Sequence, residues 1–179
     1  MKESEMTSPR TLLQAWNIRA DKRLGQHFLT DPATAAVIVQ AAAISSRDVV
    51  LEIGAGLGAL TILAARQAAR IYAVEKDARL ADLLRAEFMA NGINNVVLMK
   101  KNILRVDIRA LAAEAGVRLV VIGNLPYNIS SQILVQLISV REAVKQAVLM
   151  FQMELAERLT AGPGGRDYGR LSVMIQYCA

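Results

Sequence analysis

Val49-Val-Leu-Glu-Ile-Gly-Ala-Gly-Leu-Gly58 joins a short apolar run to a loop with three glycines. The run has the length and the β-branched residues of a buried strand. The glycines let the main chain turn sharply and approach a ligand, and the helix predicted over 59–69 offers its N-terminal amides. A second apolar run, 71–74, ends at Glu75, where a carboxylate can accept hydrogen bonds from both hydroxyls of a ribose. We interpret this stretch as a nucleoside-binding loop; the alternative is an ordinary tight turn followed by a surface acid.

Predicted strands and helices alternate along the rest of the chain. Strands are expected over 49–53, 71–74, 96–99, 119–122 and 147–151, and helices over 32–43, 59–69, 108–115, 130–138, 154–159 and 171–178, with a further short helix that starts at Ser8-Pro9. After the second strand we also expect a helix that carries Leu80, Leu83, Leu84 and Phe88 on one face and is closed by Asn91-Gly92. The helix 32–43 is predicted from Asp31-Pro32 as cap and first residue, followed by apolar residues at Ala36, Val37, Val39 and Ile44. Strands that alternate with helices through short loops predict an α/β fold with a mostly parallel sheet and helices on both faces.

Composition narrows the classes of protein. The chain has 179 residues, of which 54% are hydrophobic and 21% charged, so we expect one domain with a sizeable core. A single cysteine, Cys178, and a single histidine, His27, exclude a disulfide framework and lead us to expect no metal site. The 21 Lys and Arg against 16 Asp and Glu give a net charge of +5, which is compatible with nucleic acid without establishing it.

The location of the protein is predicted from two features that the sequence lacks, a signal peptide and a membrane segment. Its first residues are polar and lack the apolar centre of a signal peptide. The longest uncharged stretch, 119–140, contains Asn, Pro, Ser and Gln residues that are costly in hydrocarbon. We therefore expect a cytoplasmic protein with no membrane segment.

Asn124-Leu-Pro-Tyr127 follows the predicted strand 119–122. The side-chain oxygen of Asn124 and the main-chain carbonyl of Leu125 make two converging acceptors for the hydrogens of an exocyclic amine. Tyr127 offers a flat face on which a base can stack. The glycine spacing alone does not distinguish a site for NAD from a site for another nucleoside cofactor, whereas this tetrapeptide does. The alternative is an Asn-Pro turn with a core tyrosine.

Five segments of the chain together resemble one family. They are Lys22-Arg-Leu-Gly-Gln-His-Phe-Leu29, Glu52-Ile-Gly-Ala-Gly-Leu-Gly58, Val74-Glu-Lys-Asp77, Gly123-Asn-Leu-Pro-Tyr-Asn-Ile-Ser130 and Tyr168-Gly-Arg-Leu-Ser-Val-Met-Ile-Gln176. The chain resembles the class I, S-adenosylmethionine-dependent rRNA adenine N6-dimethyltransferases of the KsgA (RsmA) type. The last segment favours this branch over the antibiotic-resistance methylases of large-subunit rRNA. The resemblance implies a Rossmann-like fold, S-adenosylmethionine as cofactor, and N6-dimethylation of two adjacent adenines of small-subunit rRNA during ribosome biogenesis.

The resemblance also implies roles for particular residues. Those implied to bind the cofactor are Gln26, His27, Leu29, Gly54, Gly56, Glu75, Asn102 and Asn124. Those implied to be catalytic, forming the site of the target adenine, are Asn124, Leu125, Pro126 and Tyr127. Asn102 stands where the family usually has Asp, so an acceptor oxygen is kept and a charge is lost. His27 stands where the family often has Asn, and the contact there can come from the main chain.

Two basic groups are candidates for contact with RNA phosphates. One consists of Arg19, Lys22 and Arg23, and the other of Arg166 and Arg170. For each, the alternative is a solvated basic surface. We expect a monomer whose partner is the small ribosomal subunit or its rRNA.

The expected organisation has two parts. Residues 1–29 form a basic and polar segment that ends in a cofactor-closing motif, and residues 30–179 form the catalytic domain that binds S-adenosylmethionine. Relatives of this type continue further, so we expect a chain that lacks its last strands and a C-terminal helical domain, with impaired activity. Two other functions stay open: a DNA adenine N6-methyltransferase, and a non-catalytic ribosome-assembly or transcription factor that keeps the fold.

Overall fold

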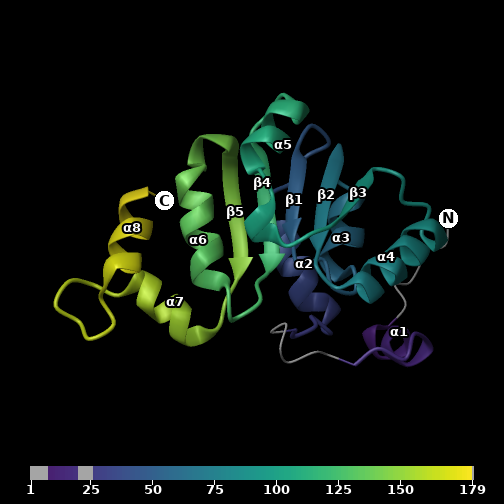
Figure 1. Cartoon of the computed structure of the whole chain (residues 1–179), viewed down its shortest axis with the longest axis horizontal. Helices are drawn as coiled ribbons and strands as arrows, with labels where there is room; N and C mark the ends of the chain where they lie inside the picture. The colour runs from purple at the N-terminus through teal and green to yellow at the C-terminus, as the bar shows by residue number, and fades with distance from the viewer. Residues whose placement is uncertain (1–7, 20–25, 179) are drawn as a thin grey trace.

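The computed structural model describes residues 8–19 and 26–178, and its centre is a five-stranded sheet (Figure 1). The strands are β1 (Val49–Ile53), β2 (Arg70–Glu75), β3 (Val96–Lys100), β4 (Leu119–Asn124) and β5 (Val144–Met150). All neighbouring strands are parallel, in the order β3-β2-β1-β4-β5. The chain thus builds outward from β1 in one direction and then in the other. The predicted parallel α/β fold is confirmed.

Helices connect the strands and cover both faces of the sheet (Figure 1). They are α1 (Pro9–Ala15), α2 (Pro32–Ala41), α3 (Ala59–Ala65), α4 (Ala78–Ala90), α5 (Ile108–Ala115), α6 (Ser130–Ser139), α7 (Met153–Thr160) and α8 (Arg170–Cys178), with 3₁₀ turns η2 (Ile103–Arg105) and η3 (Arg141–Ala143). Ser8 and Asp31 cap α1 and α2 with side-chain oxygens, and proline follows each cap, as predicted. Among the described residues, none of the helices is long and apolar enough to cross a membrane.

The hydrophobic core lies in two layers, one on each face of the sheet. α2 and α3 pack against the face that carries Val50, Ile71 and Val120. α5 and α6 pack against the opposite face, which carries Leu51 and Tyr72. Because successive strand residues point to opposite faces, one apolar run serves both layers.

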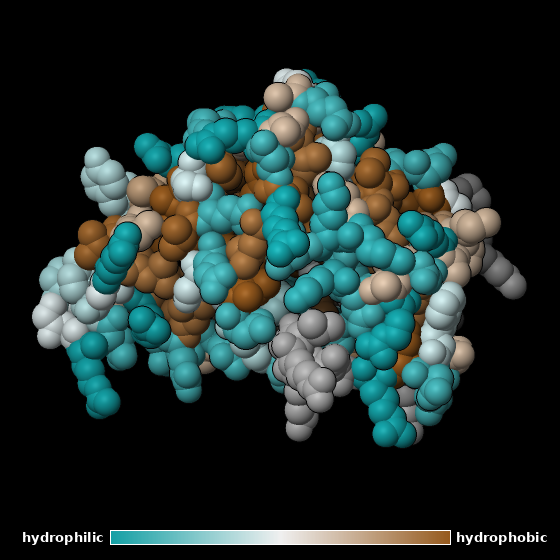
Figure 2. Space-filling model, viewed as in Figure 1, coloured by the Kyte–Doolittle hydropathy of each residue, from teal (hydrophilic) through white to brown (hydrophobic). Residues whose placement is uncertain are grey.

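A third, smaller cluster places the N-terminal helix. Leu12 of α1 packs against Leu80 and Leu83 of α4 and against Leu57 of the glycine loop. This contact fixes α1 beside the ends of the strands from which that loop emerges. Figure 2 shows mainly polar side chains over this side of the molecule, with apolar side chains visible over α6 and α8 on the left.

Three of the predicted boundaries are wrong in detail. α2 ends at Ala41 rather than residue 43, and its buried residues are Ala35, Ile38 and Val39, while Val37 is 63% exposed. α3 ends at Ala65 rather than residue 69, and residues 66–69 form the turn that leads into β2. β5 begins at residue 144 rather than 147.

The early start of β5 has a structural cause. The register shifts between Leu119 and Val120, so that Lys145 is an extra residue in β5 without a partner in β4. Its Nζ lies 2.6 Å from Oδ1 of Asp48, whose Oδ2 accepts hydrogen bonds from the main chain and hydroxyl of Ser45. The bond from Lys145, followed by that from Ser45, lowers the pKa of Asp48 to about 2. The edge strand is thereby fixed to the residues that precede β1.

Candidate active site

A pocket lies at the carboxyl ends of the central strands, where the direction of strand order reverses between β1 and β4. This is the place where open parallel sheets bind ligands. Its lining comes from the loops after β1, β2, β3 and β4, together with residues 26–29, which precede α2. Every residue predicted to bind the cofactor lines this pocket, as do Leu125 and Pro126 of the predicted catalytic set. The structure thus gathers sequence-distant segments at one edge of the sheet.

The glycine loop turns in a conformation that suits glycine. Gly54 and Gly56 have φ values of +76° and +58°, in the left-handed region. A Cβ on Gly54 would lie 3.5 Å from the main-chain oxygen of Asn124, so the first turn of the loop runs close to the end of β4. The loop therefore presents main chain, rather than side chains, to the pocket.

Glu75 is held by the loop that it faces. Its Oε2 accepts a hydrogen bond from the amide of Gly56 at 2.9 Å, and its Oε1 accepts one from the amide of Asp77 at 2.8 Å. The carboxyl is mostly buried, and burial raises its pKa. A carboxylate can accept about four hydrogen bonds, so acceptor capacity remains beside those from the amides of Gly56, Asp77 and Lys76. Glu75 is therefore fixed in place with acceptor capacity left for a ligand.

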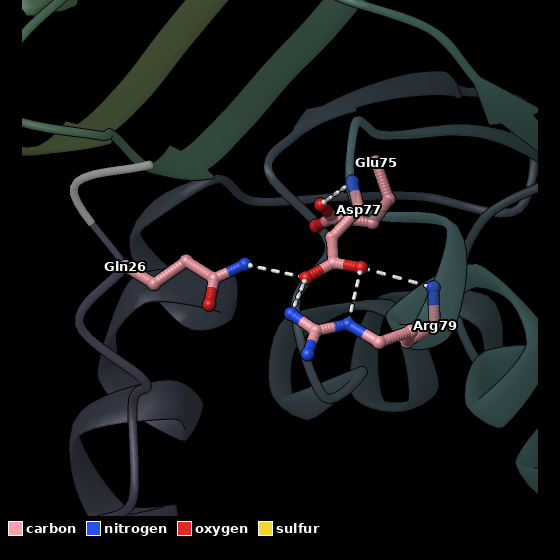
Figure 3. A network of polar contacts seen from close by, with 4 residues as sticks. All are labelled: Gln26, Glu75, Asp77 and Arg79. Atoms are coloured by element: carbon pink, nitrogen blue, oxygen red, sulfur yellow. Dashed lines mark hydrogen bonds and ion pairs between the residues drawn. The ribbon is translucent and has the colours of Figure 1, made fainter. Parts of the chain in front are cut away.

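Asp77 links the N-terminal segment to the loop after β2. Its Oδ2 accepts a hydrogen bond from Nε2 of Gln26 at 3.2 Å and pairs with Arg79 at 2.7 Å, while its Oδ1 caps α4 through the Arg79 amide (Figure 3). The bonds from the Arg79 guanidinium are the main reason that the pKa of Asp77 is lowered. Gln26 is thus hydrogen-bonded to Asp77, the residue whose amide also holds Glu75.

Glu52 is a functional candidate that the sequence analysis did not single out. It lies in β1, lines the pocket and is 1% exposed. Its Oε2 has no hydrogen-bond partner among the described residues. Burial, with a smaller contribution from the charge of Glu75, raises the pKa of Glu52 to about 8. The available signal was a carboxylate inside an otherwise apolar strand.

Asn124 ends β4 with its side chain oriented by the N-terminal segment. Its Nδ2 donates to the main-chain oxygen of His27 at 2.7 Å. No described residue donates a hydrogen bond to its Oδ1. One end of the amide is therefore committed, and the acceptor end is available.

The next three residues are placed differently from one another. Leu125 is buried, and its amide donates to the main-chain oxygen of Met150 in β5. Pro126 lines the pocket, and its carbonyl accepts from the hydroxyl of Ser130 at 2.8 Å. Tyr127 is not in the core: it is 36% exposed and does not line the pocket, but lies against the ring of His27. The alternative of a core tyrosine is wrong.

The loop after β3 contributes Asn102 and a lysine that the sequence did not suggest. Oδ1 of Asn102 accepts from the amide of Leu104 at 3.1 Å, which caps the 3₁₀ turn η2. Lys76 and Lys101 are exposed at the rim of the pocket, and the amide of Lys101 donates to the carbonyl of Glu75. Only the strand register brings these two lysines together.

The two predicted groups of RNA-binding residues are described only in part. Arg19 is exposed beyond α1 and lines a separate shallow hollow, while Lys22 and Arg23 lie outside the described residues. Arg166, in the loop before α8, and Arg170, the first residue of α8, are exposed at the opposite end of the molecule (Figure 1). No described geometry links the two groups.

The chain is similar in sequence to proteins of one family. A model of the family described as ribosomal RNA adenine dimethylase matches residues 17–179. A ribosomal RNA small subunit methyltransferase A from Desulforapulum autotrophicum is 55% identical over 97% of this chain and 61% of its own length. One from Geobacter sulfurreducens is 43% identical over 89% of this chain and 57% of its own. The chain thus spans about three fifths of the length of these relatives.

Two solved structures share the fold at substantial identity. A dimethyladenosine transferase from Plasmodium falciparum has a TM-score of 0.73 and 33% identity, and the match covers 84% of this chain and 52% of that one. The 23S rRNA methyltransferase ErmE has a TM-score of 0.69 and 31% identity, over 84% of this chain and 57% of that one. The fold is therefore that of the Rossmann-like methyltransferases.

Proposed function

The chain belongs to the ribosomal RNA adenine dimethylase family, and from this premise we propose that it methylates N6 of adenine in small-subunit rRNA, with S-adenosylmethionine as methyl donor. The observation that carries the proposal is the position of Asn124, which lines the pocket together with the glycine loop and Glu75 and whose Oδ1 accepts no hydrogen bond from the described residues. An amine acceptor and a nucleoside-type pocket share one edge of the sheet. Relatives named for small-subunit rRNA supply the substrate class.

The residues of the pocket fit S-adenosylmethionine. Glu52 offers a buried oxygen without a partner, which suits a cationic group of a ligand. Gly54 and Gly56 leave room where side chains would stand, and Glu75 keeps lone pairs for ribose hydroxyls. We propose that these residues hold the cofactor together with Gln26, His27, Leu29, Asn102 and Asn124. When bound, S-adenosylmethionine supplies an electrophilic methyl group.

The chain itself does the work of preparing the acceptor. Oδ1 of Asn124 and the carbonyl of Leu125 accept the two hydrogens of the adenine amine, whose lone pair is otherwise conjugated with the ring. Drawing the nitrogen toward tetrahedral geometry strengthens both bonds in the transition state. No strong base is needed, and Tyr127 stacks on the base. Pro126 keeps the turn between these groups rigid.

The proposal extends to the organisation of the chain. Residues 1–29 close the pocket through Gln26 and His27, residues 30–179 are the catalytic domain, and the protein acts as a cytoplasmic monomer on the small ribosomal subunit. We propose that Arg19, Lys22 and Arg23, and separately Arg166 and Arg170, contact RNA phosphates, so that removing the first group lowers the salt dependence of binding.

The decisive test is the variant Asn124→Ala. It should abolish transfer of tritiated methyl groups to small ribosomal subunits while rRNA binding in a filter assay stays within about twofold, because the acceptor is lost and the phosphate contacts are kept. Asn94→Ala, an exposed asparagine away from the pocket, is the matched control. Equal loss of transfer and binding would refute this role for Asn124. Transfer to duplex DNA in preference to subunits, or cofactor binding without transfer to either, would refute the proposed substrate or activity.

A further inference from the structure

His27, which lines the pocket, and Tyr127, which does not, are far apart in the sequence and form a ring contact. Their ring centroids are 4.4 Å apart, and the planes are inclined by 36°. His27 belongs to the irregular segment before α2, and Tyr127 to the turn after β4. Aromatic rings at this separation attract one another and restrict each other's rotation.

The same residue also holds Asn124, but through its main chain. The carbonyl of His27 accepts from Nδ2 of Asn124 at 2.7 Å. Any amino acid at position 27 supplies that carbonyl, whereas only a ring supplies the contact with Tyr127. The two functions of position 27 can therefore be separated by substitution.

The imidazole is not needed to anchor its own segment. Phe28 packs in the cluster of α1 and α4, and Leu29 packs against the core layer of α2 and α3. On the other side, Gln26 is bonded to Asp77. Because its neighbours are anchored in these ways, the main chain at position 27 is held in place, and the ring of His27 is left to pack against Tyr127.

The spacing decides where a base can stack. A base between two rings needs about 3.5 Å on each side, so the rings would have to be about 7 Å apart. The observed separation leaves no such room. A base that stacks on Tyr127 must use the ring face that His27 does not cover.

We propose that the imidazole of His27 is a positioning group for the target adenine: it covers one face of Tyr127 and presents the other, so that His27, Tyr127 and the base form a three-ring stack. The inference rests on the proposed function, because adenine is the base that this function supplies. It assigns the ring of His27 to the RNA substrate, in addition to whatever its main chain contributes to the pocket.

Variants at position 27 test the proposal. His27→Ala and His27→Asn keep the carbonyl and remove the ring, so the KM for small ribosomal subunits should rise about three- to tenfold, the effect expected for one aromatic contact. His27→Phe restores a ring and should recover most of that loss. The Kd for S-adenosylmethionine should change less than about twofold in all three. Tyr177→Ala removes an exposed aromatic ring elsewhere and is the matched control.

A second measurement does not depend on turnover. A short single-stranded RNA that carries one 2-aminopurine should lose fluorescence when it binds the unmodified chain, because the base stacks on a ring. The fluorescence loss should be smaller with His27→Ala and His27→Asn, and with His27→Phe it should return to nearly that of the unmodified chain. If the unmodified chain transfers no methyl groups to subunits, the proposed function fails, and the quenching series still decides the role of the ring. Equal quenching or equal KM in His27→Ala and the unmodified chain would overturn the inference. The inference would also be overturned if the unmodified chain did not quench the fluorescence, or if the His27 variants lost affinity for the cofactor alone.

Discussion

Glu52→Gln should stabilise the ligand-free protein, and by an amount that grows with pH. The carboxyl is buried in β1 with Oε2 unpartnered among the described residues, and burial raises its pKa from an ordinary value of 4.5 to about 8. In the unfolded chain the same group ionises near its ordinary value. Glutamine has nearly the same shape and carries no charge at any pH.

The size of the effect follows from the two pKa values. Between about pH 4.5 and pH 8 the folded chain keeps a proton that the unfolded chain has lost, so the free energy of unfolding falls as pH rises. At about 1.36 kcal/mol per pKa unit, the loss reaches at most about 5 kcal/mol and is complete above about pH 8. The glutamine variant escapes this loss, so its advantage over the unmodified chain should widen through the same window and then stay constant.

Urea unfolding followed by circular dichroism, at intervals from about pH 5 to pH 9, measures this difference. Glu157→Gln makes the same chemical change at an exposed position of α7 and should show no widening advantage. Parallel stability curves for Glu52→Gln and the unmodified chain would refute the assignment of a buried, neutral carboxyl. Under the proposed function, calorimetry should show weaker S-adenosylmethionine binding in Glu52→Gln, so the same change that stabilises the protein impairs its site.

Three further predictions concern the sheet, its edge and the cofactor. Gly123→Ala should lower the free energy of unfolding by about 1–3 kcal/mol, because its Cβ would lie 2.7 Å from the main-chain oxygen of Ile53 in β1; an unchanged urea midpoint would contradict this. Asp48→Asn should lower the free energy of unfolding by about 2 kcal/mol at neutral pH, because Lys145 lowers the pKa of Asp48 to about 2 in the folded chain. The difference from the unmodified chain should vanish as pH falls from about 4 toward 2. A loss of stability that does not depend on pH would point to packing instead. Asn102→Asp should tighten S-adenosylmethionine binding about two- to tenfold in calorimetry, because a charged acceptor makes a stronger hydrogen bond; unchanged affinity would contradict the proposed contact.

Each of these variants has a matched control in the chain. Gly92→Ala adds a Cβ that meets nothing within 4 Å, so it tests the backbone strain of a glycine at φ +64° without a steric clash. Asp167→Asn removes a carboxylate from an exposed loop. Asn94→Asp adds the same charge as Asn102→Asp at an exposed site away from the pocket.

The sequence predicted the fold most accurately where the local chemistry allows one outcome. The limits of β1 and α5 are those expected, because a mainly apolar run that ends at Gly54 and a helix stopped by Gly116 leave few alternatives. The buried face of α2 is not predictable from its sequence, since nearly every residue of that helix is apolar. The start of β5 was missed because Lys145 forms a bulge that is held by Asp48, a contact between distant residues.

The candidate site was predictable only in part for the same reason. The glycine loop, Glu75 and the segment that begins at Asn124 are short motifs, and the parallel sheet brings their strand ends to one edge. The orientation of Asn124 by the carbonyl of His27 is a tertiary contact that no local pattern contains. Nor does local sequence show that Glu52 is unpartnered, because that depends on what surrounds it in three dimensions.

Asp48 and Glu52 show how the fold divides stability from ligand binding across a single strand. Asp48 directly precedes β1 and has three polar contacts that lower its pKa to about 2, so its charge stabilises the folded chain. Glu52, near the other end of the same strand, has an unpartnered oxygen and a pKa raised to about 8, so its charge destabilises the folded chain. A ligand with a cationic group beside Glu52 would remove that penalty, and its binding energy would then appear as stability of the protein. At the carboxyl end of β1, a polar group is therefore left for a ligand to pair, whereas at the amino end the polar groups pair with one another.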